Sequence, residues 1–93
     1  MRNESGFEEF LLQEKTINSR KAVSSRMSKA RKAEIILGQE LDVIVADDDL
    51  MFDSLKALQP HEDPAHTPMQ NAVRKYYKFQ NGKEFSQLRY YRR

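Results

Sequence analysis

The chain has 93 residues and a net charge of +2, with 39% hydrophobic and 32% charged residues, and its length fits one domain with a thin core. It contains no cysteine, which excludes a disulfide scaffold and a thiolate zinc site, and no apolar run near the roughly 20 residues that span a bilayer. Because the N-terminus also lacks the apolar stretch of a secretory signal, we expect a soluble, cytoplasmic protein that needs no cofactor.

The first predicted helix is short and runs from Phe7 to Glu14, with hydrophobic residues at positions 7, 10, 11 and 12. Ser5 is the expected N-cap, because Glu8 follows it at the spacing of a capping box.

The second predicted helix is the longest, from Ile17 to about Leu37. Asn18 or Ser19 can cap its start, and Gly38 can end it in a left-handed conformation. At 100° per residue, one arc of this helix is apolar and consists of Val23, Met27, Ala30, Ala33 and Leu37.

Two features depart from that amphipathic pattern. Arg26 falls inside the apolar arc, where its aliphatic stem has to carry the guanidinium outward to water. Ile35 and Ile36 fall on the polar side, so we expect the last turn to pack against another element.

Residues 41–46 have the composition of a strand but no partner strand, and we interpret them as an extended connector. In this interpretation Val43, together with Ile44 or Val45, points into the core. A third helix then runs from about Leu50 to Leu58.

Asp47, Asp48 and Asp49 precede that third helix. Carboxylates at this position oppose the positive end of the helix dipole, which favours a capping role. A metal site is the less favoured alternative, because consecutive residues point in different directions and the glycine and distal glutamate of a calcium loop are missing. We therefore expect no bound metal.

Residues 59–66 are a predicted loop broken by two prolines. Thr67 is the expected cap of a fourth helix, with Pro68 at the first helical position and Gln70 closing a capping box. The helix is predicted to reach about Gln80 and to end at Asn81-Gly82. Its apolar stripe consists of Met69, Val73, Tyr76 and Tyr77, with Ala72 or Phe79 at its margins.

These elements predict an all-α fold, a small orthogonal bundle of four helices. Residues 1–82 form the predicted helical domain, and residues 83–93 form a tail, a linker or a short fifth helix.

Charge is strongly segregated along the chain. Residues 15–33 contain seven basic residues and no acid, and residues 64–93 contain seven basic residues and one acid. Between them, residues 34–63 contain nine acids and one base. Two basic segments divided by an acidic one are typical of a polyanion-binding surface, and a merely solvated charged surface is the alternative.

Duplex DNA is the polyanion that these residues suit best. Lysine and arginine neutralise phosphates, and serine hydroxyls donate to phosphate oxygens. The predicted contacts on the second helix extend over about 18 Å and those on the fourth helix form a second basic face. The full set is Arg20, Lys21, Ser24, Ser28, Arg31, Lys32, Arg74, Lys75 and Lys78.

No catalytic motif is present, neither a phosphate-binding glycine loop nor a zinc-protease helix nor a nucleophile elbow. Tyr90 and Tyr91 lie beside arginines, but a chain this small offers little scaffold for a phosphoryl-transfer site. We therefore predict that the chain is not an enzyme.

Three segments together resemble the core-binding domain of tyrosine recombinases, the phage integrase family. They are Phe7-Glu8-Glu9-Phe10-Leu11, Thr16-Ile17-Asn18-Ser19-Arg20 leading to Met27-Ser28-Lys29-Ala30-Arg31-Lys32, and Asn71-Ala72-Val73-Arg74-Lys75-Tyr76-Tyr77-Lys78-Phe79. The last is similar to that family's A-[LV]-R-x-[FY]-x-x-F helix.

The resemblance implies a SAM-like helical fold whose second and fourth helices lie against duplex DNA, with a role in DNA integration or recombination. The family's catalytic residues belong to a separate C-terminal domain, so the chain is expected to be a fragment of a recombinase or a stand-alone relative. Within this chain the resemblance assigns DNA contact to the nine residues named above.

Two other functions stay open. The chain is alternatively a small phage or mobile-element protein that acts as an inhibitor or adaptor, binding a protein partner through Asp47, Asp48, Asp49 and Asp53. Self-association through the aromatic C-terminal residues is the third possibility.

Overall fold

The computed structural model describes residues 1–15 and 19–92, and these residues form helices and no strands. The predicted all-α fold is confirmed. The elements in chain order are α1 (Glu4–Gln13), α2 (Arg20–Leu37), α3 (Leu41–Val45), α4 (Asp48–Leu58), α5 (Pro68–Asn81), and the short 3-10 turns η1 (Gln59–His61) and η2 (Leu88–Tyr90).

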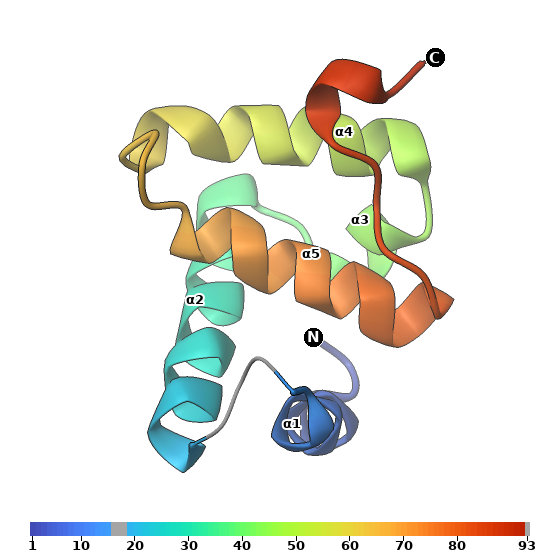
Figure 1. Ribbon diagram of the computed structural model, residues 1–93. Helices are drawn as coiled ribbons and strands as arrows, with labels where there is room; N and C mark the ends of the chain where they lie inside the picture. The colour runs from blue at the N-terminus through green and yellow to red at the C-terminus, as the bar shows by residue number, and fades with distance from the viewer. Residues whose placement is uncertain (16–18, 93) are drawn as a thin grey trace.

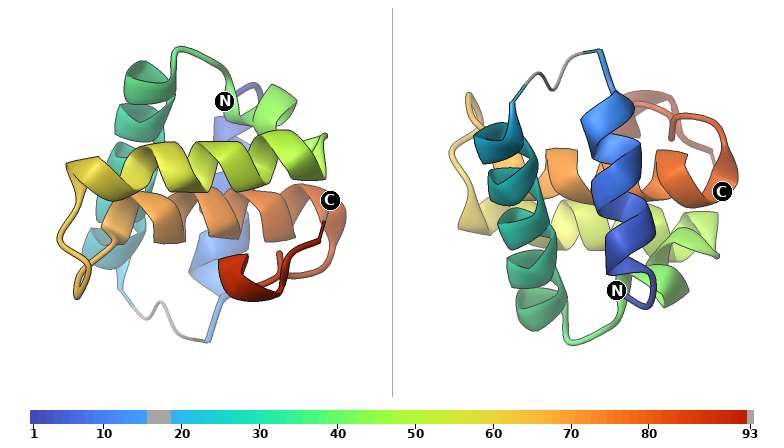
Figure 2. Two further views of the ribbon diagram at one scale, coloured as in Figure 1. Left: turned by 90° about the horizontal axis from the view of Figure 1, so that it is seen from above. Right: turned by 90° about the horizontal axis from the view of Figure 1, so that it is seen from below.

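Two pairs of helices cross to make a compact bundle with a radius of gyration of 12.4 Å. α1 lies beside α2, and α4 lies beside α5, as Figures 1 and 2 show from three directions. The largest contact in the molecule is between α2 and α5, the two helices predicted to bind DNA. Within the described residues, no helix is both long and apolar enough to cross a bilayer.

The core lies where the two helix pairs cross, and it contains the predicted apolar stripes. Val23, Met27, Ala30 and Ala33 are all buried on α2, as are Met69, Val73, Tyr76 and Tyr77 on α5. Phe7 of α1 meets Tyr76 edge to face, with 5.0 Å between ring centroids. Such aromatic pairs add about 0.5–1.5 kcal/mol to the stabilisation from buried area alone.

Several predicted helix ends are confirmed. The Ser19 hydroxyl accepts a hydrogen bond from the Ala22 amide at 3.1 Å, and Gly38 ends α2 with a φ of 68°. Asp47 caps α4 by accepting from the Leu50 amide at 3.1 Å. Gly82 ends α5 with a φ of 74°. The alternative α2 cap, Asn18, lies outside the described residues.

Two predicted caps are wrong. α1 begins at Glu4, and its cap is Asn3, whose side chain accepts from the Gly6 amide at 3.1 Å, so Ser5 lies inside the helix. Thr67 makes no side-chain cap on α5. The Glu62 carboxylate takes its place by accepting from the first amides of α5, including that of Gln70 at 3.2 Å.

The extended connector at residues 41–46 is also wrong, because residues 41–45 form the short helix α3. The Glu34 carboxylate accepts from the Leu41 amide at 2.9 Å and so satisfies an amide at the start of that turn. The helical turn buries Leu41, Ile44 and Val45, whereas Val43, expected in the core, is 41% exposed. Packing of three apolar residues outweighs the β-propensity of the segment.

The last turn of α2 packs only in part as expected. Ile36 is half-buried and packs against the core, whereas Ile35 is 80% exposed. The expectation for Ile35 is therefore wrong.

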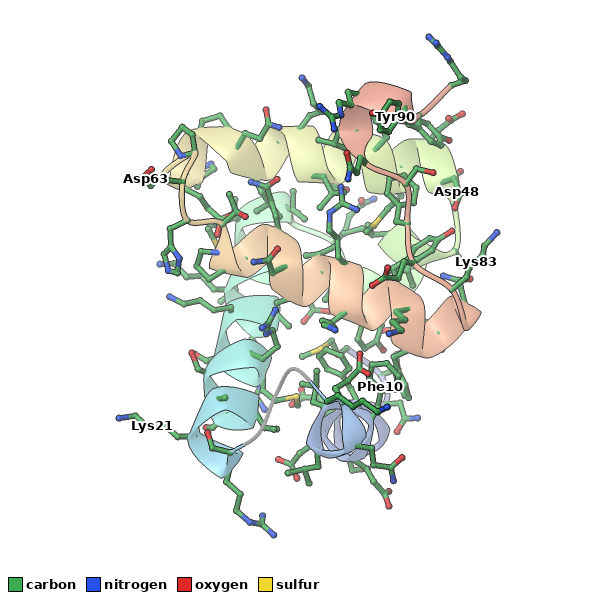
Figure 3. All side chains as sticks on the ribbon, viewed as in Figure 1. Phe10, Lys21, Asp48, Asp63, Lys83 and Tyr90 are labelled. Carbon is green, nitrogen blue, oxygen red and sulfur yellow. The ribbon has the colours of Figure 1, made fainter. Side chains whose placement is uncertain are left out.

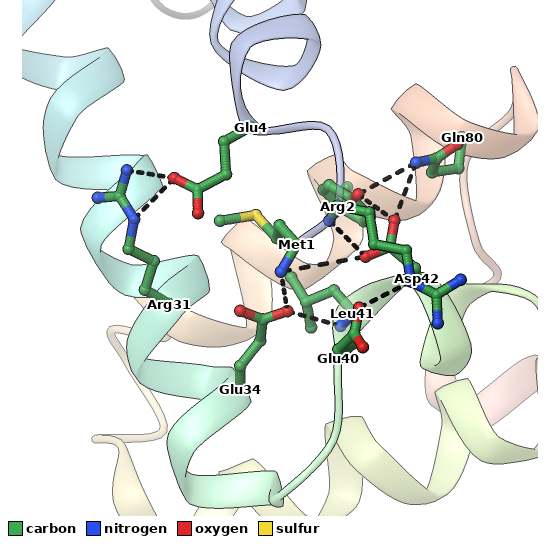
Figure 4. Close-up of polar contacts among 10 residues, drawn as sticks. Met1, Arg2, Glu4, Arg31, Glu34, Glu40, Leu41, Asp42 and Gln80 are labelled. Atoms are coloured by element: carbon green, nitrogen blue, oxygen red, sulfur yellow. Dashed lines mark hydrogen bonds and ion pairs between the residues drawn. The ribbon is translucent and has the colours of Figure 1, made fainter.

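The first two residues tie the N-terminus to α2 and α3 (Figure 4). The Met1 ammonium forms an ion pair with Glu34, and the Arg2 amide donates to Asp42 at 2.8 Å. Asp42 also accepts a hydrogen bond from the Tyr76 hydroxyl. Burial raises the pKa of Asp42, but these hydrogen bonds outweigh burial and leave the pKa below its ordinary value.

Residues 83–92 run back across the bundle and contain η2, which agrees with the expectation of a final helical turn. Phe85 is only 7% exposed and meets Tyr77 at 5.1 Å between ring centroids. Tyr91 stacks on Phe52 of α4 at 5.2 Å. The segment that was expected to be a tail or linker therefore contributes to the core.

Candidate nucleic-acid interface

The outer face of α2 carries the six predicted contacts of the first basic segment, and all six are exposed. Ser19 and Gly38 fix the ends of this helix, and its buried stripe fixes its rotation, so these side chains point away from the core. Figure 3 shows Lys21 extending into solvent at the start of α2. The residues of this outer face are Arg20, Lys21, Ser24, Ser28, Arg31 and Lys32.

Within the part of the chain that the structure describes, Arg31 is the one residue of the outer face with an acidic partner. Arg31 donates from Nε and Nη2 to Glu4 of α1, at 3.0 and 2.6 Å. Both side chains are about half exposed, at 51% and 43%. An exposed pair of this kind stabilises a fold by about 0.2–1 kcal/mol, so a phosphate can displace the glutamate.

The lysines of α5 are held more firmly. Lys75 and Lys78 both donate to Oε1 of Glu14, at 2.8 and 3.3 Å, and that carboxylate is only 17% exposed. The hydrogen bond from Lys75 is the main cause that holds the pKa of Glu14 below its ordinary value, although burial opposes it. These two predicted DNA contacts therefore also link α5 to the end of α1.

Arg74 is held by the C-terminal segment. Its Nη1 donates to the carbonyl oxygens of Phe85 and Ser86, both at 3.1 Å, and its guanidinium lies 5.8 Å from the centroid of the Phe85 ring. Burial lowers the pKa of Arg74, and Glu84 opposes that shift. Arg74 therefore has a structural role in anchoring residues 85 and 86.

Arg26 is a basic residue of the cleft that the predicted site left out. The structure brings it together with Arg74, Lys75 and Lys78 around a cleft of about 430 Å³, which Glu84 and Phe85 also line. The signal in the sequence was a lone arginine within an apolar arc. Because α5 packs against α2, the Arg26 side chain lies beside α5 and not on the outer face of α2.

The nine predicted contacts consequently fall into two groups. The three on α5 line this cleft, and none of the six on α2 does. Arg20 and Ser24 instead line a shallow hollow with Glu8 and Leu12 of α1, and Lys32 lines another hollow with His61 and His66. The two basic faces adjoin through the α2–α5 contact but present different surfaces.

The acidic residues proposed for a protein partner are used within the fold. Besides the cap formed by Asp47, Asp48 accepts from the Tyr77 hydroxyl at 2.8 Å, and Asp49 accepts from the Tyr91 hydroxyl at 2.7 Å. Burial and the Asp48 bond raise the pKa of Tyr77 to about 12. The partner hypothesis, which also includes Asp53, stays a prediction without added support.

Within residues 1–15 and 19–92, no group of three histidine, aspartate or glutamate side chains is placed to hold a metal ion.

Comparison with known proteins provides no relative on which to base a function: no family model, no curated protein and no solved structure matches this chain.

Proposed function

We propose that this chain is a non-catalytic DNA-binding module that grips duplex DNA through backbone phosphates, with the outer face of α2 as the main contact. The observation that carries the proposal is the composition of that face. Four exposed cations and two exposed hydroxyls share it, and its segment of sequence contains no acid from Lys15 to Ala33. A helix face that is merely solvated usually mixes in glutamates for i, i+4 pairs.

The bundle supports this proposal by its geometry. The outer face lies on a rigid helix of 18 residues, anchored by its buried stripe and by α5, so its cations keep a fixed spacing. Phosphate contacts from such a helix set position and not sequence preference. We accordingly propose largely sequence-nonspecific binding in the cytoplasm.

The finer part of the proposal is a SAM-like core-binding domain of the phage integrase family, acting in DNA integration or recombination. The sequence resemblance supports this part, together with the helical bundle and the contact between α2 and α5. In this proposal Arg74, Lys75 and Lys78 play a lesser part in duplex binding, because intramolecular acceptors already engage them.

The test is a salt titration of affinity for a duplex of mixed sequence. Replacing both Lys21 and Lys32 with glutamine removes two exposed cations, and we expect the slope of log affinity against log salt to flatten by about 1.8. Lys56→Gln on α4, also an exposed lysine, is the matched control and should leave the slope unchanged. Lys75→Gln should change the slope less than either Lys21→Gln or Lys32→Gln does alone.

Two results would reject this function. The first is that the unaltered chain fails to shift a duplex at low salt. The second is that Lys56→Gln weakens binding as much as a substitution on the outer face of α2, which would mean that only net charge matters.

A further inference from the structure

The cleft between α2, α5 and the C-terminal segment has the size and the polarity of a ligand site. Its volume of about 430 Å³ lies within the range of small-molecule pockets, roughly 300–1,000 Å³. Four cations line it, together with Phe85 and Glu84. It is distinct from the outer face of α2, the surface that we propose for duplex binding.

Arg26 is the most informative group in this cleft. It sits in the apolar arc of α2, its side chain is partly buried, and burial lowers its pKa. It forms no hydrogen bond or ion pair with the described residues, in contrast to every other cation of the cleft. A guanidinium that is partly removed from water and has no hydrogen-bond acceptor destabilises the fold, and a bound anion would offset that cost.

The neighbouring cations also have donors to spare. Both hydrogen bonds of Arg74 come from Nη1, which leaves Nε and Nη2 available to a ligand. Lys75 and Lys78 share a single oxygen of Glu14, so each ammonium keeps two further N–H groups. The cleft therefore offers guanidinium and ammonium donors from two helices.

The charges of the cleft do not cancel. Arg26, Arg74, Lys75 and Lys78 contribute four positive charges, and the two carboxylates beside them, Glu14 and Glu84, contribute two negative charges. Two positive charges remain, and a doubly charged anion would neutralise them. A phosphate monoester carries about −1.5 to −2 at neutral pH, whereas a phosphodiester carries only one negative charge.

We propose that this cleft is a binding site for one phosphate monoester group or inorganic phosphate. Arg26 and Arg74 present planar donors to two of its oxygens, and Lys75 and Lys78 balance its charge. The site does not depend on duplex binding, because its deciding residue, Arg26, is not on the outer face of α2.

The test is a titration with inorganic phosphate at constant ionic strength, followed by NMR signals of the arginine side chains or by isothermal calorimetry. Arg26→Gln keeps most of the aliphatic stem and removes the charge, and we expect at least a tenfold loss of affinity. Lys29→Gln is the matched control on the same helix, outside both the cleft and the outer face, and should change affinity less than twofold.

A second variant tests the site by a gain in binding. Glu14→Gln removes the carboxylate that competes for Lys75 and Lys78, so phosphate should bind more tightly. Dimethyl phosphate is a monoanionic diester, like the phosphate of a nucleic-acid backbone. If the cleft takes a monoester, dimethyl phosphate should bind at least tenfold more weakly than inorganic phosphate.

Three results would overturn this assignment. They are the absence of phosphate binding at millimolar concentrations, equal losses in Arg26→Gln and Lys29→Gln, and equal affinities for phosphate and dimethyl phosphate. The last result would assign the cleft to a diester of the nucleic-acid backbone. Loss of duplex binding on substitution of Lys21 and Lys32, with phosphate binding intact, would separate this site from the proposed function.

Discussion

Single residues decide how this small bundle distributes its charge. Glu14 lies at the end of α1, and its one oxygen Oε1 accepts from two lysines of α5. That bridge joins Glu14 to two lysines that follow it in the sequence by 61 and 64 positions. Arg26 lines the same cleft as these lysines but has no such acceptor among the described residues. The cations of one cleft therefore differ in their availability to a ligand, because Glu14 lies near Lys75 and Lys78.

The same bridge makes stability depend on acidic pH. The pKa of Glu14 is lower in the folded chain than in the unfolded chain, so the unfolded chain takes up the proton first as pH falls. The contribution of Glu14 is therefore complete above its ordinary pKa of about 4.5, and it is lost as pH falls through the folded value.

We expect Glu14→Gln to lower the free energy of unfolding by about 1–2 kcal/mol at pH 7 and to have almost no effect near pH 2. Thermal melts of both proteins from pH 7 to pH 2 measure the difference. Glu9→Gln, an exposed acid on the same helix, is the control. A difference that stays constant across this range would contradict the charge-assisted bridge.

At the scale of the helix, α2 depends on its ends as much as on its buried stripe. Its first turn contains no acid, so the Ser19 hydroxyl supplies the side-chain acceptor there. We expect Ser19→Ala to destabilise the protein by about 1 kcal/mol in chemical denaturation.

Ser25→Ala provides the matched control for the cap, because Ser25 is exposed within the same helix. Alanine has the higher helix propensity there, so this change should be neutral or slightly stabilising. If the two substitutions had the same effect, the hydroxyl of Ser19 would not be acting as a cap.

The comparison of α2, α3 and α5 shows which elements the sequence predicts. α2 and α5 repeat an apolar stripe over several turns and end in glycine, so periodicity and end signals agree. α3 has five residues, of which Val43, Ile44 and Val45 favour strands. Its helical form depends on an acceptor from Glu34, a tertiary contact that no local pattern reveals.

The candidate site likewise has one part that the sequence predicts and another that depends on the fold. Exposure of the outer face of α2 follows from its helical period, and the structure agrees with it. The partners of the α5 cations do not follow from local sequence, because Glu14 and the carbonyls of residues 85 and 86 come from other segments. Arg26 was visible as an exception to the apolar arc, but its position beside α5 requires the fold.

For the molecule as a whole, the last ten described residues are part of the bundle. Residues 83–92 leave α5 at Gly82 and return over α4, as Figure 1 shows. Phe85 fills a place against Tyr77 and Tyr91, and its carbonyl holds Arg74. A core this small has few aromatic residues, so each one carries a large share of the buried area.

We therefore expect Phe85→Ala to lower the free energy of unfolding by about 3 kcal/mol, because it removes a buried ring and leaves a cavity. Tyr90→Ala is the control, since Tyr90 is 64% exposed and lies on the neighbouring turn η2, and it should change stability by less than about 0.5 kcal/mol. Urea denaturation followed by circular dichroism measures both. Equal stability of Phe85→Ala and the unaltered chain would mean that residues 83–92 are an independent tail, and the side of the cleft that Glu84 and Phe85 line would then not be fixed.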